Sequence, residues 1–186
     1  MDKVVRNDLF DARKGYDRGR NVAVMALWQI VKAAVFISTV PYPSGLKVQL
    51  LRSFGARVGT GVVIRPRVNI HLPWKLDVGN HCWIGEDSGL LNLERVVLKD
   101  HVAIAHRVYI ATGNHDYTDS TMAFRNAPTT IERGVWIASC AFVGPGVVIG
   151  EHSVICAGSV VTKSTEPWSI VRGNPAQVVG RRTLVK

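Results

Sequence analysis

Six histidines are the side chains of this sequence best suited to acid–base or metal chemistry, because imidazole exchanges protons near neutral pH and binds divalent metals. They are His71, His81, His101, His106, His115 and His152. His115 opens the stretch HDYTDSTMAFRNAPTT, which is polar and aromatic. A general base must be held rigidly beside a cleft, so the place of each histidine in the fold decides what it can do.

The cysteines point to free thiols. Cys82, Cys140 and Cys156 form no pair with C-x-x-C or C-x-x-H spacing. An odd count without metal spacing is typical of a reducing compartment. We expect no signal peptide, because the apolar run starts late and no small-residue cleavage site follows it. The sequence therefore predicts a cytoplasmic protein.

The elements that must position these residues are visible as a repeat of six residues from about residue 58 to 161. Aliphatic residues recur at that spacing in four runs, namely Val58, Ile64 and Ile70; Val78, Ile84 and Leu90; Leu98, Ile104 and Ile110; and Ile131, Ile137, Val143, Ile149, Ile155 and Val161. The next position is often small, as in Gly59, Gly79, Gly85 and Ala105, and a further inward-packing residue follows four positions after the aliphatic one.

A helix would rotate such a repeat around its surface, and an ordinary strand alternates with period two. A short strand followed by a corner explains the spacing: the aliphatic residue points inward and the small residue lets the backbone turn. Three sides of six residues make one coil of 18 residues, and coils stack at roughly 4.8 Å. The sequence predicts an all-β parallel β-helix; the alternative is a β-sandwich with coincidental spacing.

The histidines occupy different places on this lattice. His81, His101 and His152 stand three positions after an aliphatic residue, at a corner, and His106 stands one position earlier, so solvated turn residues are expected; His71 lies in an irregular early coil. His115 alone stands where the repeat gives way to a long loop, since Ile110 and Ile131 are 21 residues apart. Loops inserted in a solenoid often form its binding face. The position of His115 alone is equally compatible with a catalytic base held by the coil and with an ordinary loop histidine.

Composition limits the partners. The chain has 186 residues, 47% hydrophobic and 20% charged, which suits one folded domain, and its net charge of +9 suits an anionic partner. Lysines and arginines are scattered except at 13–20 and 181–182. This disfavours nucleic acid and favours a small phosphorylated ligand.

The amino-terminal part differs from the repeat. Residues 1–50 are expected to form a basic segment and an apolar helix, and residues 51–186 the β-helix domain, with an inserted loop at about 114–130 and a C-terminal tail. Residues 22–40 are near the minimum length for spanning a bilayer, but Gln29 and Lys32 fall in the middle. A helix against the prism or a neighbouring subunit is expected, and a membrane-surface helix with basic flanks is the alternative.

The repeat resembles the hexapeptide-repeat transferases, whose prism is left-handed, whereas the crossover rule for parallel strands would give a right-handed one. The pieces IATGNHD, GVWIAS, AFVGPGVVIG, ICAGSVVTK and RGNPAQVV are similar to those of the maltose, galactoside and nodulation-factor O-acetyltransferases. LLRSFGARVGTGVVIRPRVNI and PWKLDVGNHCWIGEDSGLLNL look like the colanic acid biosynthesis acetyltransferases. The resemblance runs from Leu50 to near the end of the chain.

The resemblance implies direct acetyl transfer from acetyl-CoA to a hydroxyl, with His115 as the base and Ser139 near the oxyanion. For acetyl-CoA it implies Trp136 and Ser139 near the thioester, Ala157 and Gly158 along the pantetheine arm, and Thr162, Lys163 and Arg181 toward the phosphates. Ala157, Gly158 and Lys163 also suit plain coil packing or a solvated corner. Gln177 stands where the galactoside enzymes carry an arginine, which shifts the expected phosphate contact to Arg181.

The acceptor side departs further from the family. Gly85 stands where the galactoside enzymes have an asparagine, so Asn114, Asp87 and Asn92 are the expected substrate-binding residues. Zinc is not expected: His101 and His106 have the His-x4-His spacing of hexapeptide-repeat carbonic anhydrases, but their positions relative to the aliphatic residues differ.

A sugar of a surface polysaccharide or its precursor is the expected acceptor. An amino sugar acylated on nitrogen, a non-sugar alcohol and a non-catalytic binding prism are the alternatives. The resemblance also implies a homotrimer with acetyl-CoA between adjacent prisms. Because polysaccharide precursors are often lipid-linked, a peripheral contact of residues 22–40 with the cytoplasmic face of the inner membrane stays open.

Overall fold

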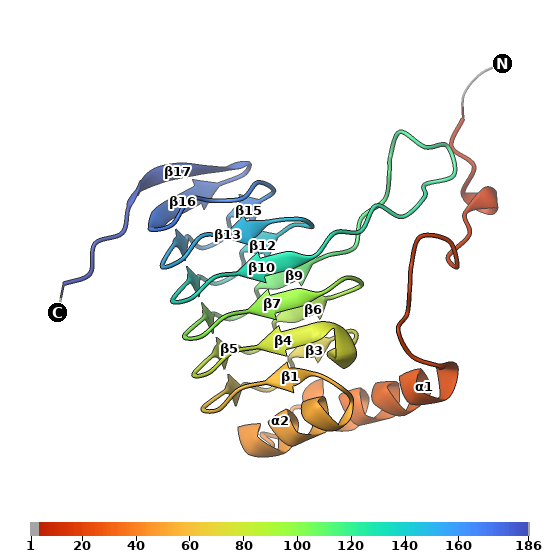
Figure 1. Ribbon diagram of the computed structural model, residues 1–186, viewed down its shortest axis with the longest axis horizontal. Helices are drawn as coiled ribbons and strands as arrows, with labels where there is room; N and C mark the ends of the chain where they lie inside the picture. The colour runs from red at the N-terminus through yellow and green to blue at the C-terminus, as the bar shows by residue number, and fades with distance from the viewer. Residues whose placement is uncertain (1–3, 186) are drawn as a thin grey trace.

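The protein is a prism of three parallel sheets, described by a computed structural model for residues 4–185 (Figure 1). Sheet A stacks β1 (Arg57–Val58), β4 (Leu76–Val78), β7 (Val96–Leu98), β10 (Thr129–Ile131) and β13 (Val148–Ile149). Sheet B stacks β2 (Val63–Ile64), β5 (Trp83–Ile84), β8 (Ala103–Ile104), β11 (Trp136–Ile137), β14 (Val154–Ile155) and β16 (Ser169–Gly173), followed by the antiparallel β17 (Ala176–Arg181). Sheet C stacks β3 (Asn69–Ile70), β6 (Gly89–Leu91), β9 (Tyr109–Ala111), β12 (Phe142–Val143) and β15 (Val160–Val161).

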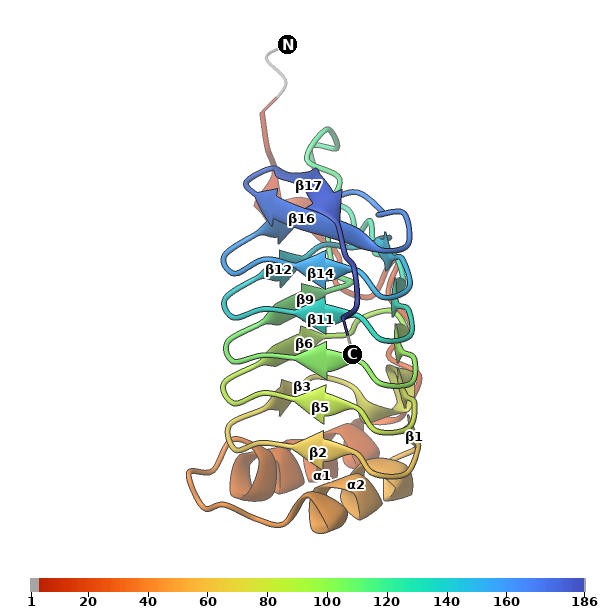
Figure 2. The ribbon, with the colours of Figure 1, turned by 90° about the vertical axis from the view of Figure 1, so that its left-hand side faces the viewer.

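Successive strands pass from sheet A to B to C, so the prism has three edges, named here the A–B, B–C and C–A edges. In Figure 2 sheet B faces the viewer, and its parallel strands run from right to left as the chain rises from β2 to β14. This is a left-handed winding, and the predicted left-handed parallel β-helix is confirmed.

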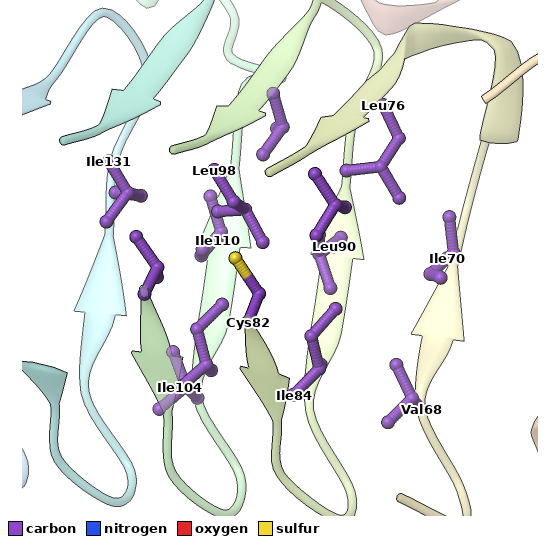
Figure 3. Packing of buried hydrophobic residues seen from close by; sticks show 14 of the residues in the cluster. Val68, Ile70, Leu76, Cys82, Ile84, Leu90, Leu98, Ile104, Ile110 and Ile131 are labelled. Atoms are coloured by element: carbon purple, nitrogen blue, oxygen red, sulfur yellow. The ribbon is translucent and has the colours of Figure 1, made fainter. Parts of the chain in front are cut away.

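The repeat of six forms the core. In sheet B, Ile64, Ile84, Ile104, Ile137 and Ile155 lie in register on successive coils, and none is more than 2% exposed. Figure 3 shows the equivalent side chains of the three sheets, together with Cys82, pointing into the interior. Burial of each aliphatic side chain contributes about 2 kcal/mol, so the stack stabilises the whole prism.

The corners show that one expected reason was wrong. The turn is made by residues with left-handed φ, including His81 (55°), His101 (59°) and His152 (58°). The small residues two positions earlier answer a different need: a Cβ on Gly85 would lie 2.5 Å from the backbone of Ala105 in the next coil. Close stacking of the coils, and not turning, requires glycine there.

Two helices cover the amino-terminal end of the prism (Figures 1 and 2). The predicted helix over 22–40 forms α1 (Val22–Val31), which continues as the π-helix η2 (Lys32–Phe36) and ends earlier than expected. Trp28 is fully buried, and its indole N–H donates to the carbonyls of Ile70 and His71 at 3.1 Å each. The second helix, α2 (Ser44–Ser53), was not predicted, and it crosses the expected division between residues 50 and 51.

Three shorter features complete the chain. Residues 4–21 form an amino-terminal arm, with the 3-10 turn η1 (Asn7–Leu9), which runs from α1 along the prism in Figure 1. A further 3-10 turn, η3 (Pro73–Lys75), precedes β4. The predicted inserted loop lies between β9 and β10 and projects from the C–A edge.

Candidate active site

The inserted loop is an ordered two-stranded ribbon. Backbone hydrogen bonds join its two arms from Ala127 to Thr112 (3.0 Å), from Arg125 to Asn114 (2.8 Å) and from Asp116 to Ala123 (2.8 Å). His115 lies in this ladder, bridged antiparallel to Phe124. These hydrogen bonds fix the backbone at His115 relative to β9, and a general base needs such a fixed position.

The tautomer of His115 is set by one hydrogen bond. Its Nδ1 lies 2.6 Å from the carbonyl oxygen of Met122, which can only accept a proton. The neutral ring therefore carries its proton on Nδ1 and keeps a lone pair on Nε2. Met122 presents this carbonyl from a left-handed turn with φ of 54°.

Aromatic side chains hold the imidazole from two sides. Phe124 stacks on it with ring centroids 4.9 Å apart, and Phe10 of the amino-terminal arm meets it edge-on at 5.3 Å. Phe10 also contacts Phe124 at 5.2 Å, and Tyr16 packs on the Phe124 ring at 5.6 Å. Such pairs favour fixed ring orientations, so the arm restricts how His115 can turn.

The arm also walls the space beside the ribbon. The backbone N–H of Arg6 donates to the carbonyl of Ser120 at 2.7 Å. A cavity of about 140 Å³ lies between the arm and the ribbon, lined by Leu9, Phe10, Asp11, Lys14, Thr121 and Ala123.

The two flanking residues of His115 differ: Asn114 is exposed, whereas Asp116 is half-buried and accepts from the hydroxyl and N–H of Thr118, which lowers the pKa of its carboxyl.

The residues expected to bind acetyl-CoA lie on two edges of the prism. Trp136 projects from sheet B with 47% of its surface exposed, and Ser139, Ala157 and Gly158 lie at the B–C edge beyond it. Thr162 and Lys163 are exposed beyond β15 at the C–A edge, from which the His115 ribbon also leaves. One chain therefore does not bring all of them together.

The carboxy-terminal arginines have different surroundings. Arg182 donates to the carbonyls of Gly134 (3.0 Å) and His152 (3.1 Å), so it fastens β17 to the A–B edge. Arg181 is exposed on β17, and no ion pair to it occurs among residues 4–185. The guanidinium of Arg181 is thus the more accessible of the two.

Two of the residues predicted to bind the acceptor, Asn92 and Asp87, differ in their exposure. Asn92 is fully buried, and its amide accepts from the N–H and donates to the carbonyl of Leu72, so it holds a coil and offers no exposed atom to a sugar. Asp87 lies at the B–C edge and pairs with Arg67 at 2.6 Å, which lowers the pKa of its carboxyl. A cavity of about 450 Å³ joins Asp87 to Ser139, with Arg67, Glu86, His106, Arg107 and Cys140 around it.

Three residues that contact the His115 ring were not predicted from the sequence. Met122 acts through its backbone carbonyl, which no side-chain pattern indicates, and Phe124 was noted only as part of an aromatic loop. Phe10 lies in a segment without periodicity, and nothing in its neighbourhood in the sequence points to His115.

Comparison with known proteins agrees with this architecture. The family model described as bacterial transferase hexapeptide (six repeats) matches residues 128–163. The putative colanic acid biosynthesis acetyltransferase WcaF of Escherichia coli (strain K12) is 38% identical over 173 residues, which cover 93% of this chain and 94% of the relative.

Two solved structures share the fold. A hexapeptide-repeat acetyltransferase of Vibrio cholerae in complex with acetyl coenzyme A superposes with a TM-score of 0.80 at 22% identity, covering 97% of this chain and 98% of the other. A galactoside acetyltransferase in complex with coenzyme A has a TM-score of 0.76 at 26% identity, covering 86% and 80%.

Proposed function

This chain belongs to the hexapeptide-repeat acetyltransferases, and we propose that it moves the acetyl group of acetyl-CoA directly to a hydroxyl of a sugar, with His115 as the general base. The sugar would belong to a surface polysaccharide or its precursor, and the similarity to a putative colanic acid biosynthesis acetyltransferase supports this acceptor class. The observation that carries the proposal is the His115 ring, whose Nδ1 faces the Met122 carbonyl and whose Nε2 thereby keeps its lone pair.

The chemistry follows from the poor nucleophilicity of a hydroxyl. Nε2 of His115 takes the hydroxyl proton while the oxygen attacks the thioester carbon, and a tetrahedral intermediate forms. Collapse of the intermediate forms the ester and breaks the carbon–sulfur bond, and the proton passes from His115 to the departing sulfur of coenzyme A. The backbone N–H of Ser139 is the proposed donor to the oxyanion.

The same proposal assigns the acetyl-CoA residues. Trp136 and Ser139 would lie near the thioester, Ala157 and Gly158 along the pantetheine, and Thr162, Lys163 and Arg181 toward the phosphates. Gly158 suits close approach of a ligand, because a Cβ added there would meet no atom within 4 Å. Asn114 and Asp87 would contact the acceptor.

A homotrimer would complete this site. The B–C edge of one copy, with Ser139 and Ala157, must meet the C–A edge of another, with Lys163 and His115. A contact between two different edges is heterologous, and it forms a closed ring of three copies if each copy is rotated by one third of a turn from its neighbour. The division of the proposed ligand residues between two edges supports this assembly.

An acceptor screen tests the function. The protein is mixed with acetyl-CoA and mono- and oligosaccharides, free thiol is followed with a thiol reagent, and products are identified by mass. We expect a sugar hydroxyl to stimulate thiol release and to gain an acetyl group. Release stimulated only by amino sugars, with an amide product, or only by non-sugar alcohols would replace the acceptor class, and no release with any acceptor would contradict catalysis.

A further inference from the structure

The helix that closes the amino-terminal end of the prism is apolar on both sides but buried on only one. Trp28 and Phe36 are fully buried against the first coil. The outer face of α1 and η2, continued by Ile37, carries apolar and exposed side chains at helical spacing: Ala23, Ala26, Leu27, Ile30, Ala34 and Ile37. The exposed fractions of Leu27 and Ile30 are 54% and 66%. A strip of this kind, here called the outer strip, is typical of a surface that meets an apolar partner.

The charge of the protein is concentrated at the same end. Residues 18–76 contain nine lysines and arginines and no aspartate or glutamate. The rest of the sequence holds 14 basic and 14 acidic residues, so this segment carries the whole net charge of +9. The helices α1, η2 and α2, here called the cap, and the first coil are therefore strongly positive, while the charges of the remaining prism are balanced.

Several of these cations are free to meet an anionic partner. Arg18 and Arg20 are exposed just before α1, and no ion pair to either occurs among residues 4–185. Arg52, at the end of α2, is exposed and donates to the backbone carbonyls of Val58 and Gly59, and within residues 4–185 it makes no ion pair. Other cations of the segment, such as Arg57 and Arg67, pair with acids of the second coil.

Two further lysines are inside the cap. Lys47 is fully buried, and its ammonium group donates to the carbonyl of Arg65 at 2.9 Å. Lys32 is 8% exposed, beneath the outer strip. Burial lowers the pKa of both amines.

We propose that this end of the prism docks on the surface of an anionic lipid bilayer. The outer strip would enter the boundary between headgroups and acyl chains, and Arg18, Arg20 and Arg52 would meet the lipid phosphates. A second copy of the cap fits poorly as the occupant, because two caps face to face would bring two strongly positive ends together. No helix within residues 4–185 is long and apolar enough to cross a bilayer, so the contact is peripheral.

Docking on this end has a consequence for the active site. The prism would stand upright on the membrane with β16 and β17 pointing away from it (Figure 1). The His115 ribbon leaves after β9, the third strand of sheet C. Because coils stack at roughly 4.8 Å, the ribbon begins only a few coil spacings from the docked end. The site would face an acceptor that projects from the membrane surface. The docking itself does not depend on which acceptor is used.

Vesicle flotation with the full chain tests the docking. Wild type is expected to float with vesicles containing about one-third phosphatidylglycerol, to stay behind with pure phosphatidylcholine, and to be released by high salt. The double variant Leu27→Asp/Ile30→Asp should lower the bound fraction on the order of tenfold, and Arg18→Gln/Arg20→Gln should weaken binding and reduce its salt dependence.

The matched control is Val178→Asp/Val179→Asp on β17, at the opposite end of the prism, where the valines are 63% and 52% exposed, and it should bind as wild type does. Wild type that ignores anionic vesicles, or a Leu27→Asp/Ile30→Asp protein that binds them normally, would overturn the proposal. A change in the mass of that variant in solution without a loss of vesicle binding would assign the strip to a contact between copies instead. Thiol release with a water-soluble acceptor, measured in parallel, reads acetyl transfer separately from docking.

Discussion

The His115 ring is held by neighbours from two separate parts of the sequence, its own ribbon and the amino-terminal arm. The Met122 carbonyl fixes its proton on Nδ1, and Phe124 stacks on its ring. Phe10, from the amino-terminal arm, contacts the same ring edge-on. The place of His115 at a break in the repeat could be predicted from the long polar insertion, and its role as the base stays a prediction. The contact of Phe10 could not be predicted, since it depends on how the arm folds back along the prism.

Replacing Phe10 should impair catalysis without impairing donor binding. In Phe10→Ala the edge-on contact at 5.3 Å is lost, and the imidazole gains freedom to turn. We expect kcat to fall about tenfold while KM for acetyl-CoA stays unchanged, with recovery in Phe10→Tyr. The control is Tyr117→Ala on the same ribbon, where the ring is 80% exposed. An unchanged kcat in Phe10→Ala would mean that the arm does not position the base.

At the scale of the elements, the repeat of six was enough to predict the strands, the inward side chains and the corner histidines. It gave the wrong reason for the small residues, because periodicity describes one coil and the restriction comes from the next. It also missed α2, whose residues Ser44–Ser53 alternate polar and apolar types without a long apolar run.

A glycine exchange separates the two reasons. Gly85→Ala would place a Cβ 2.5 Å from the Ala105 backbone, so we expect it to lower the free energy of unfolding by about 1–3 kcal/mol. Gly45→Ala in α2 meets nothing within 4 Å and should be neutral or stabilising by about 0.5–1 kcal/mol. Denaturant unfolding of both variants measures this. Equal effects would show that the coils do not restrict Gly85.

The contact between the cap and the first coil should be sensitive to acid. Burial, and secondarily the charge of Lys32, lowers the pKa of His71 below its ordinary value of 6.5. Above that value both folded and unfolded chains are neutral at His71; below it the unfolded chain binds a proton that the folded chain resists, so stability falls as pH drops.

His71→Gln should therefore lose less stability than wild type between about pH 7 and pH 5, as read from denaturant midpoints across that range. His101→Gln, at an exposed corner, is the control and should keep the wild-type dependence. An identical acid dependence in His71→Gln would remove this histidine from the account.

For the whole molecule, the central feature is that the proposed ligand residues occupy two edges. Ser139 and Ala157 lie on one edge of the chain and His115 and Lys163 leave another, so the proposed site would lie between copies. The sequence contained the residue types, but their separation onto different edges follows only from the course of the coils.

Mixing two inactive variants tests shared sites. His115→Ala removes the base from one edge, and Ala157→Trp would block the other. In randomly mixed trimers, a site is intact when His115 and Ala157 both come from unmodified edges of neighbouring copies, so about a quarter of wild-type activity should return. Activity that stays at the level of the separate variants after subunit exchange would place the whole site within one chain.

The most direct test of the account is the rate of thiol release by His115→Ala with the best acceptor from the screen. A general base contributes about 10²–10⁴-fold, so we predict a loss of kcat of that size, with acetyl-CoA still raising the melting temperature of the variant as it does for wild type. A His115→Ala protein that keeps wild-type kcat would contradict the assignment of His115 as the base.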